Sequence, residues 1–238
     1  MPEPDPEQVL RLAARDPKFV EVLEAAARAE RLVPGAVVVG ETAATLWAGH
    51  RVSYDADHVI SDLSDRFEMV LEALEQDQGW ATNRLMPGKV ILGNLDGVEV
   101  GVRQMRRRRP LEVVDLQLPS GASLRVPTIE ETLRIKAFLV IRRNQTRDYL
   151  DVAALAETMG IERAAEVLAG IDDYYADQAE SRDGVASQVV RQLGDPRPAD
   201  RSVTKQLSRY KRLQPRWSRW QDVVAVTRAV AVAMTRTG

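Results

Sequence analysis

Two aspartates, Asp55 and Asp57, offer the clearest chemistry in the sequence. They lie in residues 54–60, which alternate apolar and charged side chains as a strand does. Residues i and i+2 of a strand point to one face, so the two carboxylates would lie side by side. Anions so close repel each other unless a cation lies between them. The pattern predicts either a Mg²⁺ or Mn²⁺ site completed by phosphate oxygens, or two aspartates on a solvated strand face.

The residues before this pair could bring a phosphate to it. Residues 36–40 form a short β-branched run that predicts a buried strand ending at Gly40. Residues 42–49 have the composition of a helix and end on a glycine. Gly40 would let a phosphate approach the backbone, and the helix N-terminus would offer free N–H groups.

This strand, glycine, short helix and Asp-x-Asp strand resemble the DNA polymerase β-like nucleotidyltransferase superfamily over residues 36–60. The chain departs from that pattern at Glu41, where the superfamily has Ser or Gly. A carboxylate near a triphosphate would repel it unless it turned away or met a metal, and Thr42 could supply the missing hydroxyl.

A second candidate group is Lys136, on a helix predicted for residues 129–143. At 100° per residue, Lys136 falls inside the apolar stripe of that helix. A lysine in such a stripe must extend to solvent, pair with a carboxylate or meet a ligand anion. All three readings remain open from the sequence.

The segment Arg147-Asp-Tyr-Leu-Asp151 follows that helix. Thr146 is predicted to cap the next helix, and Asp148 would lie in its first turn, where the helix dipole favours an acid. Arg147 and Asp151 are spaced as i,i+4 partners, so a purely structural role for this segment is also open.

Taken together, the two motifs resemble the AbiEii/AbiGii group of nucleotidyltransferases, which includes the MenT toxins, over residues 36–156. The resemblance implies a catalytic set that transfers a nucleoside monophosphate from an NTP to a hydroxyl: Asp55, Asp57, Lys136 and Asp148. It implies nucleotide contacts from Gly40, Thr42, Ser53, Lys136 and Arg147. Asp55 and Asp57 would bind Mg²⁺ or Mn²⁺, and Asp148 would orient Lys136 or help to activate the acceptor.

A third metal ligand is expected on a later strand, and Glu99 is the best candidate, although it could equally face solvent. The alternative to an enzyme is a catalytically degenerate module of the same fold that binds a nucleotide or a protein, with Glu41 marking the loss of activity.

The remaining elements place these residues in an α+β fold. Helices are predicted at 7–31 and 64–78, the second capped by Ser64. Strands are predicted at 80–85, 89–92, 98–105, 111–116 and 123–126, joined by glycine-containing turns. Helices follow at 129–143, 147–158, 162–180, 184–193, 201–212 and 217–235. We expect a nucleotidyltransferase-like mixed sheet with flanking helices in residues 1–127 and a helical domain in residues 128–238, which would contribute Lys136 and Asp148.

Two basic segments could bind a polyanionic acceptor or form solvated loops, and together with the family resemblance they imply the 3′ end of tRNA as the acceptor. Residues Arg103–Arg109 contain five arginines and no acid, and Arg191–Arg219 contains nine basic and two acidic residues. Tyr210, Trp217 and Trp220 could stack on single-stranded bases, or could pack the last helix onto the core. The toxin resemblance adds a cognate antitoxin as a possible partner.

Composition limits the other possibilities. The chain has 238 residues, no cysteine and two histidines, which excludes disulfides, thiolate metal sites and a cysteine nucleophile. Its net charge of −2 divides into −5 for residues 1–127 and +3 for the remainder. The acidic, proline-rich start does not resemble a signal peptide, and the apolar stretch 223–234 is too short for a membrane span. A cytoplasmic protein without a membrane anchor is the expectation.

Overall fold

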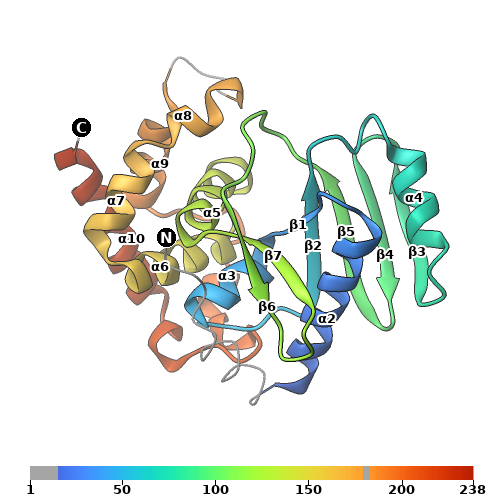
Figure 1. Cartoon of the computed structure of the whole chain (residues 1–238). Coiled ribbons are helices and arrows are strands. Elements are labelled where there is room, and N and C mark those ends of the chain that lie inside the picture. Colours follow the sequence, from blue (N-terminus) through green and yellow to red (C-terminus); the bar gives the residue numbers. More distant parts are fainter. Residues whose placement is uncertain (1–15, 179–182, 238) are drawn as a thin grey trace. The chain divides into compact units, whose positions relative to one another are not determined.

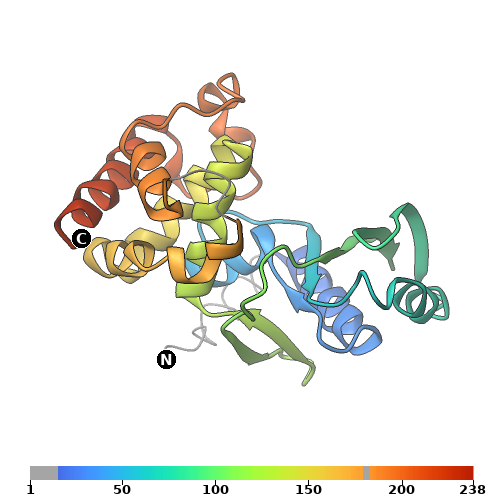
Figure 2. The same cartoon turned by 90° about the horizontal axis from the view of Figure 1, so that it is seen from above.

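The computed structural model describes residues 16–178 and 183–237. It divides into two compact units (Figures 1 and 2). The first holds the residues up to Leu46 together with Ser53–Thr128, and the second holds Trp47–Val52 together with the residues from Ile129 onward. The expected α+β class is confirmed, with a mixed sheet in the first unit and helices in the second.

Five strands form the main sheet of the first unit: β1 (Val37–Val38), β2 (Asp55–Ile60), β3 (Trp80–Met86), β4 (Val90–Leu95) and β5 (Val98–Gln104). Their order is β1-β2-β5-β4-β3. Only the β2–β5 pair is parallel among these neighbours. β3 forms one edge, and its register with β4 shifts between Thr82 and Arg84. A separate antiparallel pair consists of β6 (Val113–Gln117) and β7 (Ser123–Pro127).

Helix α2 (Pro17–Leu32) covers one face of this sheet (Figure 1). On that face β2 buries Ala56, His58 and Ile60, and His58 Nε2 lies 3.2 Å from the carbonyl oxygen of Ala26 in α2. Burial lowers the pKa of His58 to about 4, so its imidazole is neutral and acts as a structural donor. The helix predicted at 7–31 is confirmed from residue 17, and residues 7–15 lie outside the described residues.

Glu30 joins α2 to two strands of the first unit. Its Oε1 accepts a hydrogen bond from the backbone N–H of Val38 in β1 at 3.0 Å. Its Oε2 accepts one from the N–H of Arg125 in β7 at 2.7 Å. Burial nevertheless raises the pKa of Glu30 to about 7, because desolvation outweighs these two hydrogen bonds.

Two further helices belong to the sequence of the first unit. α4 (Phe67–Glu75) packs beside β3 and α2. Its N-cap is Arg66, which makes no side-chain capping bond, so the prediction that Ser64 caps this helix is wrong. α3 (Gly40–Ala48) follows β1 directly, and its last two residues are grouped with the second unit.

The second unit is built from helices: α5 (Ile129–Arg143), α6 (Thr146–Met159), α7 (Ile161–Ala169), α8 (Asp172–Tyr175), α9 (Val185–Gly194) and α10 (Trp220–Thr237). α10 packs against α6, α7 and α9. Phe138 and Tyr175 stack with ring centroids 4.1 Å apart, which helps to close the core. No helix among residues 16–178 and 183–237 has the length and apolarity that crossing a membrane needs.

Three predictions about this unit are wrong. The helix expected at 162–180 is divided, because α7 ends at Ala169 before α8 begins. Residues 201–212 form short 3₁₀ turns, Val203–Lys205 and Leu207–Arg209, because this stretch has no apolar stripe and bonds to other backbone instead. The Lys211 carbonyl accepts from Val52. Thr146 does not cap α6; the carboxylate of Asp200 accepts its backbone N–H at 2.8 Å.

Candidate functional site

In the first unit, Asp55 and Asp57 share the face of β2 that lies opposite His58, as the alternation predicts. The parallel register with β5 places Asp55 beside Glu99 and Asp57 beside Gly101. Both aspartates are partly exposed. The i, i+2 spacing therefore does bring the two carboxylates to one surface of the sheet.

Asp57 lies in a space that two glycines leave open. A Cβ on Gly101 would be 2.6 Å from Asp57 Oδ1, and a Cβ on Gly40 would be 3.7 Å from Oδ2. Gly40 has φ +75°, a conformation that glycine adopts easily, and it is the first residue of α3. Asp57 Oδ1 also accepts from Arg103 Nε at 3.2 Å. An acid, a helix N-terminus and an arginine thus meet at one place.

The hydroxyls near Asp55 stabilise this strand. Ser53 is buried, and its Oγ donates a hydrogen bond to Asp55 Oδ1. Thr42 is also buried, and its Oγ1 donates to the backbone oxygen of Asp55 at 2.6 Å. The Thr42 hydroxyl therefore bonds the main chain here, and its expected contact with the nucleotide stays a prediction.

The donor set on this face suits a hard divalent cation, because carboxylate oxygens are the ligands that Mg²⁺ and Mn²⁺ prefer. Asp55 and Asp57 could hold such an ion with substrate oxygens as further ligands. Glu99 is exposed on the same face. Among the residues that the structure describes, no three His, Asp or Glu side chains gather as a metal-binding group. The assignment of Glu99 stays a prediction.

In the second unit, Lys136 pairs with a carboxylate. Its side chain is 1% exposed, and Nζ lies 2.7 Å from Asp151 Oδ2. The prediction that Lys136 extends to solvent is therefore wrong, and the prediction that it pairs with a carboxylate is confirmed. Contact with a ligand anion stays a prediction. Asp151 is fully buried and also accepts from His50 Nε2 at 2.8 Å and from Arg51 Nε at 2.9 Å.

The electrostatics of this cluster fix its charge states. The positive charges of Arg51 and Lys136, together with the His50 hydrogen bond, hold the pKa of Asp151 well below its usual range despite burial. Burial lowers the pKa of His50, so the imidazole is neutral and its Nε2–H is the donor to Asp151. The cluster therefore contains two cations and one anion.

Asp148 lies in the first turn of α6 as predicted, and it is fully buried. Its partner is Arg143, whose Nη2 lies 2.7 Å from Oδ1. Burial raises the pKa of Asp148, and the charges of Lys136 and Arg143 oppose that rise. The expected pairing of Arg147 with Asp151 does not form, since Asp151 is already engaged and Arg147 Nε donates to Gln145 at 2.9 Å.

Sequence reasoning gave Asp151 a minor role and assigned none to His50 or Arg51. These residues are about 100 positions apart in the chain, so helical spacing could not reveal their contact. The sequence signal for these two residues was that His50 and Arg51 come a few positions before the Asp-x-Asp strand.

The basic and aromatic segments are partly used within their own units. In Arg103–Arg109, Arg103 meets Asp57, while the buried Arg107 donates to the backbone oxygens of Arg109 and Pro110. In Arg191–Arg219, Trp217 is buried under Arg216. Tyr210 lies 5.1 Å from the Arg51 guanidinium, and Trp220 meets Tyr149 edge to face. Trp217 therefore packs the helical unit, the second of the two readings, whereas Tyr210 and Trp220 stay partly exposed, so base stacking by these two rings stays a prediction.

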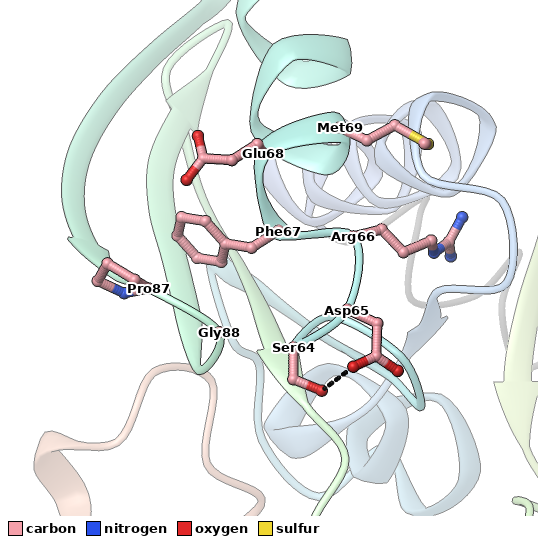
Figure 3. Close-up of a pocket in the computed structure, with 8 residues that line it drawn as sticks. All are labelled: Ser64, Asp65, Arg66, Phe67, Glu68, Met69, Pro87 and Gly88. Carbon is pink, nitrogen blue, oxygen red and sulfur yellow. Dashed lines mark hydrogen bonds between the residues drawn. The ribbon is translucent and has the colours of Figure 1, made fainter.

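A surface pocket lies elsewhere in the first unit, between the start of α4 and the turn from β3 to β4 (Figure 3). It is lined by Ser64, Asp65, Arg66, Phe67, Glu68, Met69, Pro87 and Gly88. The Ser64 Oγ hydroxyl donates a hydrogen bond to Asp65 Oδ1 there at 3.3 Å. None of the predicted site residues lines this pocket.

The chain matches a family model described as "Nucleotidyl transferase AbiEii toxin, Type IV TA system" over residues 22–229. It also resembles a solved structure, the nucleotidyltransferase toxin MenT4 from Mycobacterium tuberculosis, with a TM-score of 0.59 and 16% identity. That comparison covers 97% of this chain and 89% of MenT4, and it supports the same fold.

Curated mycobacterial relatives are much longer than this chain. The heme uptake protein MmpL11 of Mycobacterium tuberculosis is 32% identical over 237 residues, which is 90% of this chain and 22% of that protein. The mycolic acid-containing lipids exporter MmpL11 of Mycolicibacterium smegmatis is 45% identical over 96 residues, 40% of this chain and 10% of that protein. The chain thus spans about a fifth of the length of the first of these relatives.

Proposed function

The chain belongs to the AbiEii family of nucleotidyl transferase toxins, and we propose that it moves a nucleoside monophosphate from an NTP to an acceptor hydroxyl. In this reaction the hydroxyl oxygen forms a bond to the α-phosphorus. The bond from that phosphorus to the bridging oxygen of the β-phosphate breaks. Pyrophosphate leaves, and the hydroxyl proton passes to a base or to water.

The observation that carries the proposal is the position of Asp57 beside Gly40, the first residue of α3. A helix N-terminus favours phosphate, and a glycine lets it come close to the backbone. Mg²⁺ or Mn²⁺, held by Asp55 and Asp57 with Glu99 as a candidate third ligand, would neutralise charge on the phosphates. Ser53 keeps Asp55 oriented through its hydrogen bond.

For the second unit we assign Lys136 to the triphosphate, where its positive charge would offset charge on the leaving pyrophosphate. Asp148 and Arg147 complete the residues that the family resemblance implies. Asp148 would act through charge rather than direct contact with Lys136, because its carboxylate is paired with Arg143.

The acceptor we propose is the 3′ end of tRNA, and the partner we propose is a cognate antitoxin. Arginines of Arg103–Arg109 and cations of Arg191–Arg219 would contact the phosphate backbone, which needs charge rather than ring stacking. The cytoplasm, where NTPs and tRNA are abundant, is the compartment that this reaction would require.

The test is transfer of label from each α-labelled NTP to total RNA in the presence of Mg²⁺. We expect label on tRNA with the wild type and loss of more than about 100-fold with Asp57→Asn, because the variant removes a charged ligand. Asp115→Asn is a matched control, since Asp115 is an exposed aspartate on β6 that pairs loosely with Arg125.

Two results would contradict this proposal. Label on protein alone would replace RNA as the acceptor and leave the chemistry unchanged. NTP binding without any transfer would favour the alternative, a catalytically degenerate module in which Glu41 marks the loss of activity.

A further inference from the structure

We propose that Arg103 couples the binding of a divalent cation to the binding of a polyphosphate at Asp57. A cation that arrives alone would meet the positive charge of Arg103, whereas a polyphosphate would pair with that charge. This inference rests on the proposed function for the identity of the two ligands. Among the arginines of Arg103–Arg109 it assigns Arg103 to the nucleotide and leaves the others to the acceptor. The contacts that carry it all lie within the first unit.

The sheet register brings Arg103 to the face that carries the two aspartates. β5 runs parallel to its neighbour β2, so Gly101 lies beside Asp57 and Arg103 lies beside Val59 (Figure 1). Alternate residues of a strand share a face, so Arg103 is on the same side of the sheet as Asp57. A Cβ on Gly101 would be 2.6 Å from Asp57 Oδ1 and 3.8 Å from Arg103 Nε. The missing side chain at Gly101 therefore lets Arg103 reach Asp57.

Arg103 contacts Asp57 through a single hydrogen bond. Its Nε lies 3.2 Å from Asp57 Oδ1, and its two Nη groups donate no hydrogen bond within residues 16–178 and 183–237. The Arg103 side chain is 42% exposed and that of Asp57 is 35% exposed, so solvent screens the ion pair and weakens it. The pair is therefore easily exchanged, and the Nη groups remain for a second anion.

The position of Arg103 has opposite consequences for the two ligands. A divalent cation on the Asp57 carboxylate would lie beside the guanidinium, and the two positive charges would repel each other whether Arg103 stays on Oδ1 or is displaced. Phosphate oxygens match the planar fork of a guanidinium, so a polyphosphate would offset that repulsion and gain an ion pair. Arg103 should therefore weaken the binding of the cation alone and strengthen the binding of the cation with a polyphosphate.

The test uses the full chain with Mn²⁺ alone and with the Mn²⁺ complex of inorganic pyrophosphate. In Arg103→Gln, Mn²⁺ alone should bind about five- to tenfold more tightly, because the competing charge is gone. The pyrophosphate complex should bind about tenfold more weakly, because its ion pair with the guanidinium is lost. Electron paramagnetic resonance of free Mn²⁺ measures the first affinity, and calorimetry in excess Mn²⁺ measures the second. A purely structural role of Arg103 would not change the two affinities in opposite directions.

Arg125→Gln is the matched control. The Arg125 side chain is 46% exposed and forms a loose pair with Asp115, so the variant removes the same charge from the same unit without touching Asp57. Both affinities should stay within about twofold of wild type, because solvent screens such a charge. Arg103→Lys covers the case in which Arg103→Gln fails to fold. It keeps the positive charge, so Mn²⁺ alone should bind within about twofold of wild type, and a tenfold tightening there would contradict the role of charge.

The outcomes separate this inference from the proposed function. If the wild type transfers nucleotide while folded Arg103→Gln leaves either affinity unchanged, or Arg125→Gln changes both affinities equally, the inference alone is overturned. If Arg103→Gln changes the two affinities in opposite directions but the wild type transfers no nucleotide, the proposed function alone is overturned. A wild type that binds neither Mn²⁺ nor its pyrophosphate complex would overturn both.

Discussion

The carboxylate of Asp151 is the shared partner of three basic side chains in the second unit. It is fully buried and is bonded by His50, Arg51 and Lys136. The sequence predicted Lys136 as the important residue of its helix, because a lysine in an apolar stripe needs a partner. It left that partner open, because Asp151 lies on the next helix and the spacing within one helix does not reveal the contact. The contact of Arg51 with Asp151 was hidden as well, because about 100 residues of chain separate the two.

Replacing Asp151 should therefore be costly. Asp151→Asn keeps the shape but removes the carboxylate charge that the buried Lys136 and Arg51 contact, and we expect a loss of about 3–5 kcal/mol in the free energy of unfolding. Urea unfolding at neutral pH measures it. Asp195→Asn, an exposed aspartate paired with Arg197, is the control and should change stability by less than about 1 kcal/mol. Equal stability of the two variants would contradict this account of Asp151.

The position of the Asp57 carboxylate depends on the absence of a side chain at Gly101. In Gly101→Ala the new Cβ would lie 2.6 Å from Asp57 Oδ1 and 3.0 Å from Leu92 Cδ2, so the half-exposed carboxylate must move. We expect nucleotide transfer to fall by about 10-fold or more, because small displacements of a catalytic group are costly. Gly170→Ala is the control, since its Cβ would meet only Val167 O at 3.9 Å. Unchanged transfer would remove Asp57 from the reaction.

At the scale of elements, Glu30 connects α2 to β1 and β7 and makes their association dependent on pH. The ordinary pKa of a glutamate is 4.5, and in the folded chain it is about 7. Between those values the folded state holds more protons than the unfolded state, so stability falls as pH rises. The slope reaches at most about 1.4 kcal/mol per pH unit for one proton.

Glu30→Gln should flatten that slope. The amide cannot ionise, and it faces the N–H groups of Val38 and Arg125 with one acceptor oxygen. Unfolding by urea at pH 5, 6, 7 and 8 would compare the variant with wild type. Parallel curves would show that Glu30 does not titrate in this range.

The regular elements of this fold were predictable where the apolar pattern and the turn residues agree. Residues 129–143 were predicted with the bounds that α5 has, and the strands from β2 to β7 lie within a few residues of their predicted positions. The helix caps and the conformation of residues 201–212 were not predictable, because groups distant in the sequence determine them. The Asp200 carboxylate accepts from the backbone N–H of Thr146, and the Lys211 carbonyl accepts from the backbone N–H of Val52.

For the candidate site, strand alternation was sufficient to place Asp55 and Asp57 on one face. Local spacing failed at Arg147, which was expected to pair with Asp151 and instead donates to Gln145. The catalytic and nucleotide-binding roles of all these residues remain predictions that the transfer assays above test.

At the scale of the whole molecule, the chain does not divide at one point. Residues 47–52 belong with the second unit although Ser53–Thr128 belong with the first. A fragment beginning at Ile129 would lack His50 and Arg51, and its Asp151 would keep only Lys136 among the three partners described above.

We therefore expect the fragment 129–238 to unfold several degrees below the same fragment carrying residues 47–52 through a flexible linker, because each added partner stabilises Asp151. Thermal unfolding followed by circular dichroism compares the two, and a linked peptide with Arg51→Ala is the control. Identical midpoints would show that residues 47–52 contribute nothing to the second unit.

The edge strand β3 presents a backbone edge that no other strand of the sheet pairs with. All its residues after Trp80 are exposed, including Leu85 and Met86, so its outer backbone could recruit a strand from a second molecule. The register shift beside Arg84 interrupts the regular spacing that such pairing needs, and its charge repels an identical edge. We therefore expect the irregular edge of β3 to limit association between molecules at the concentrations that storage and the assays above require.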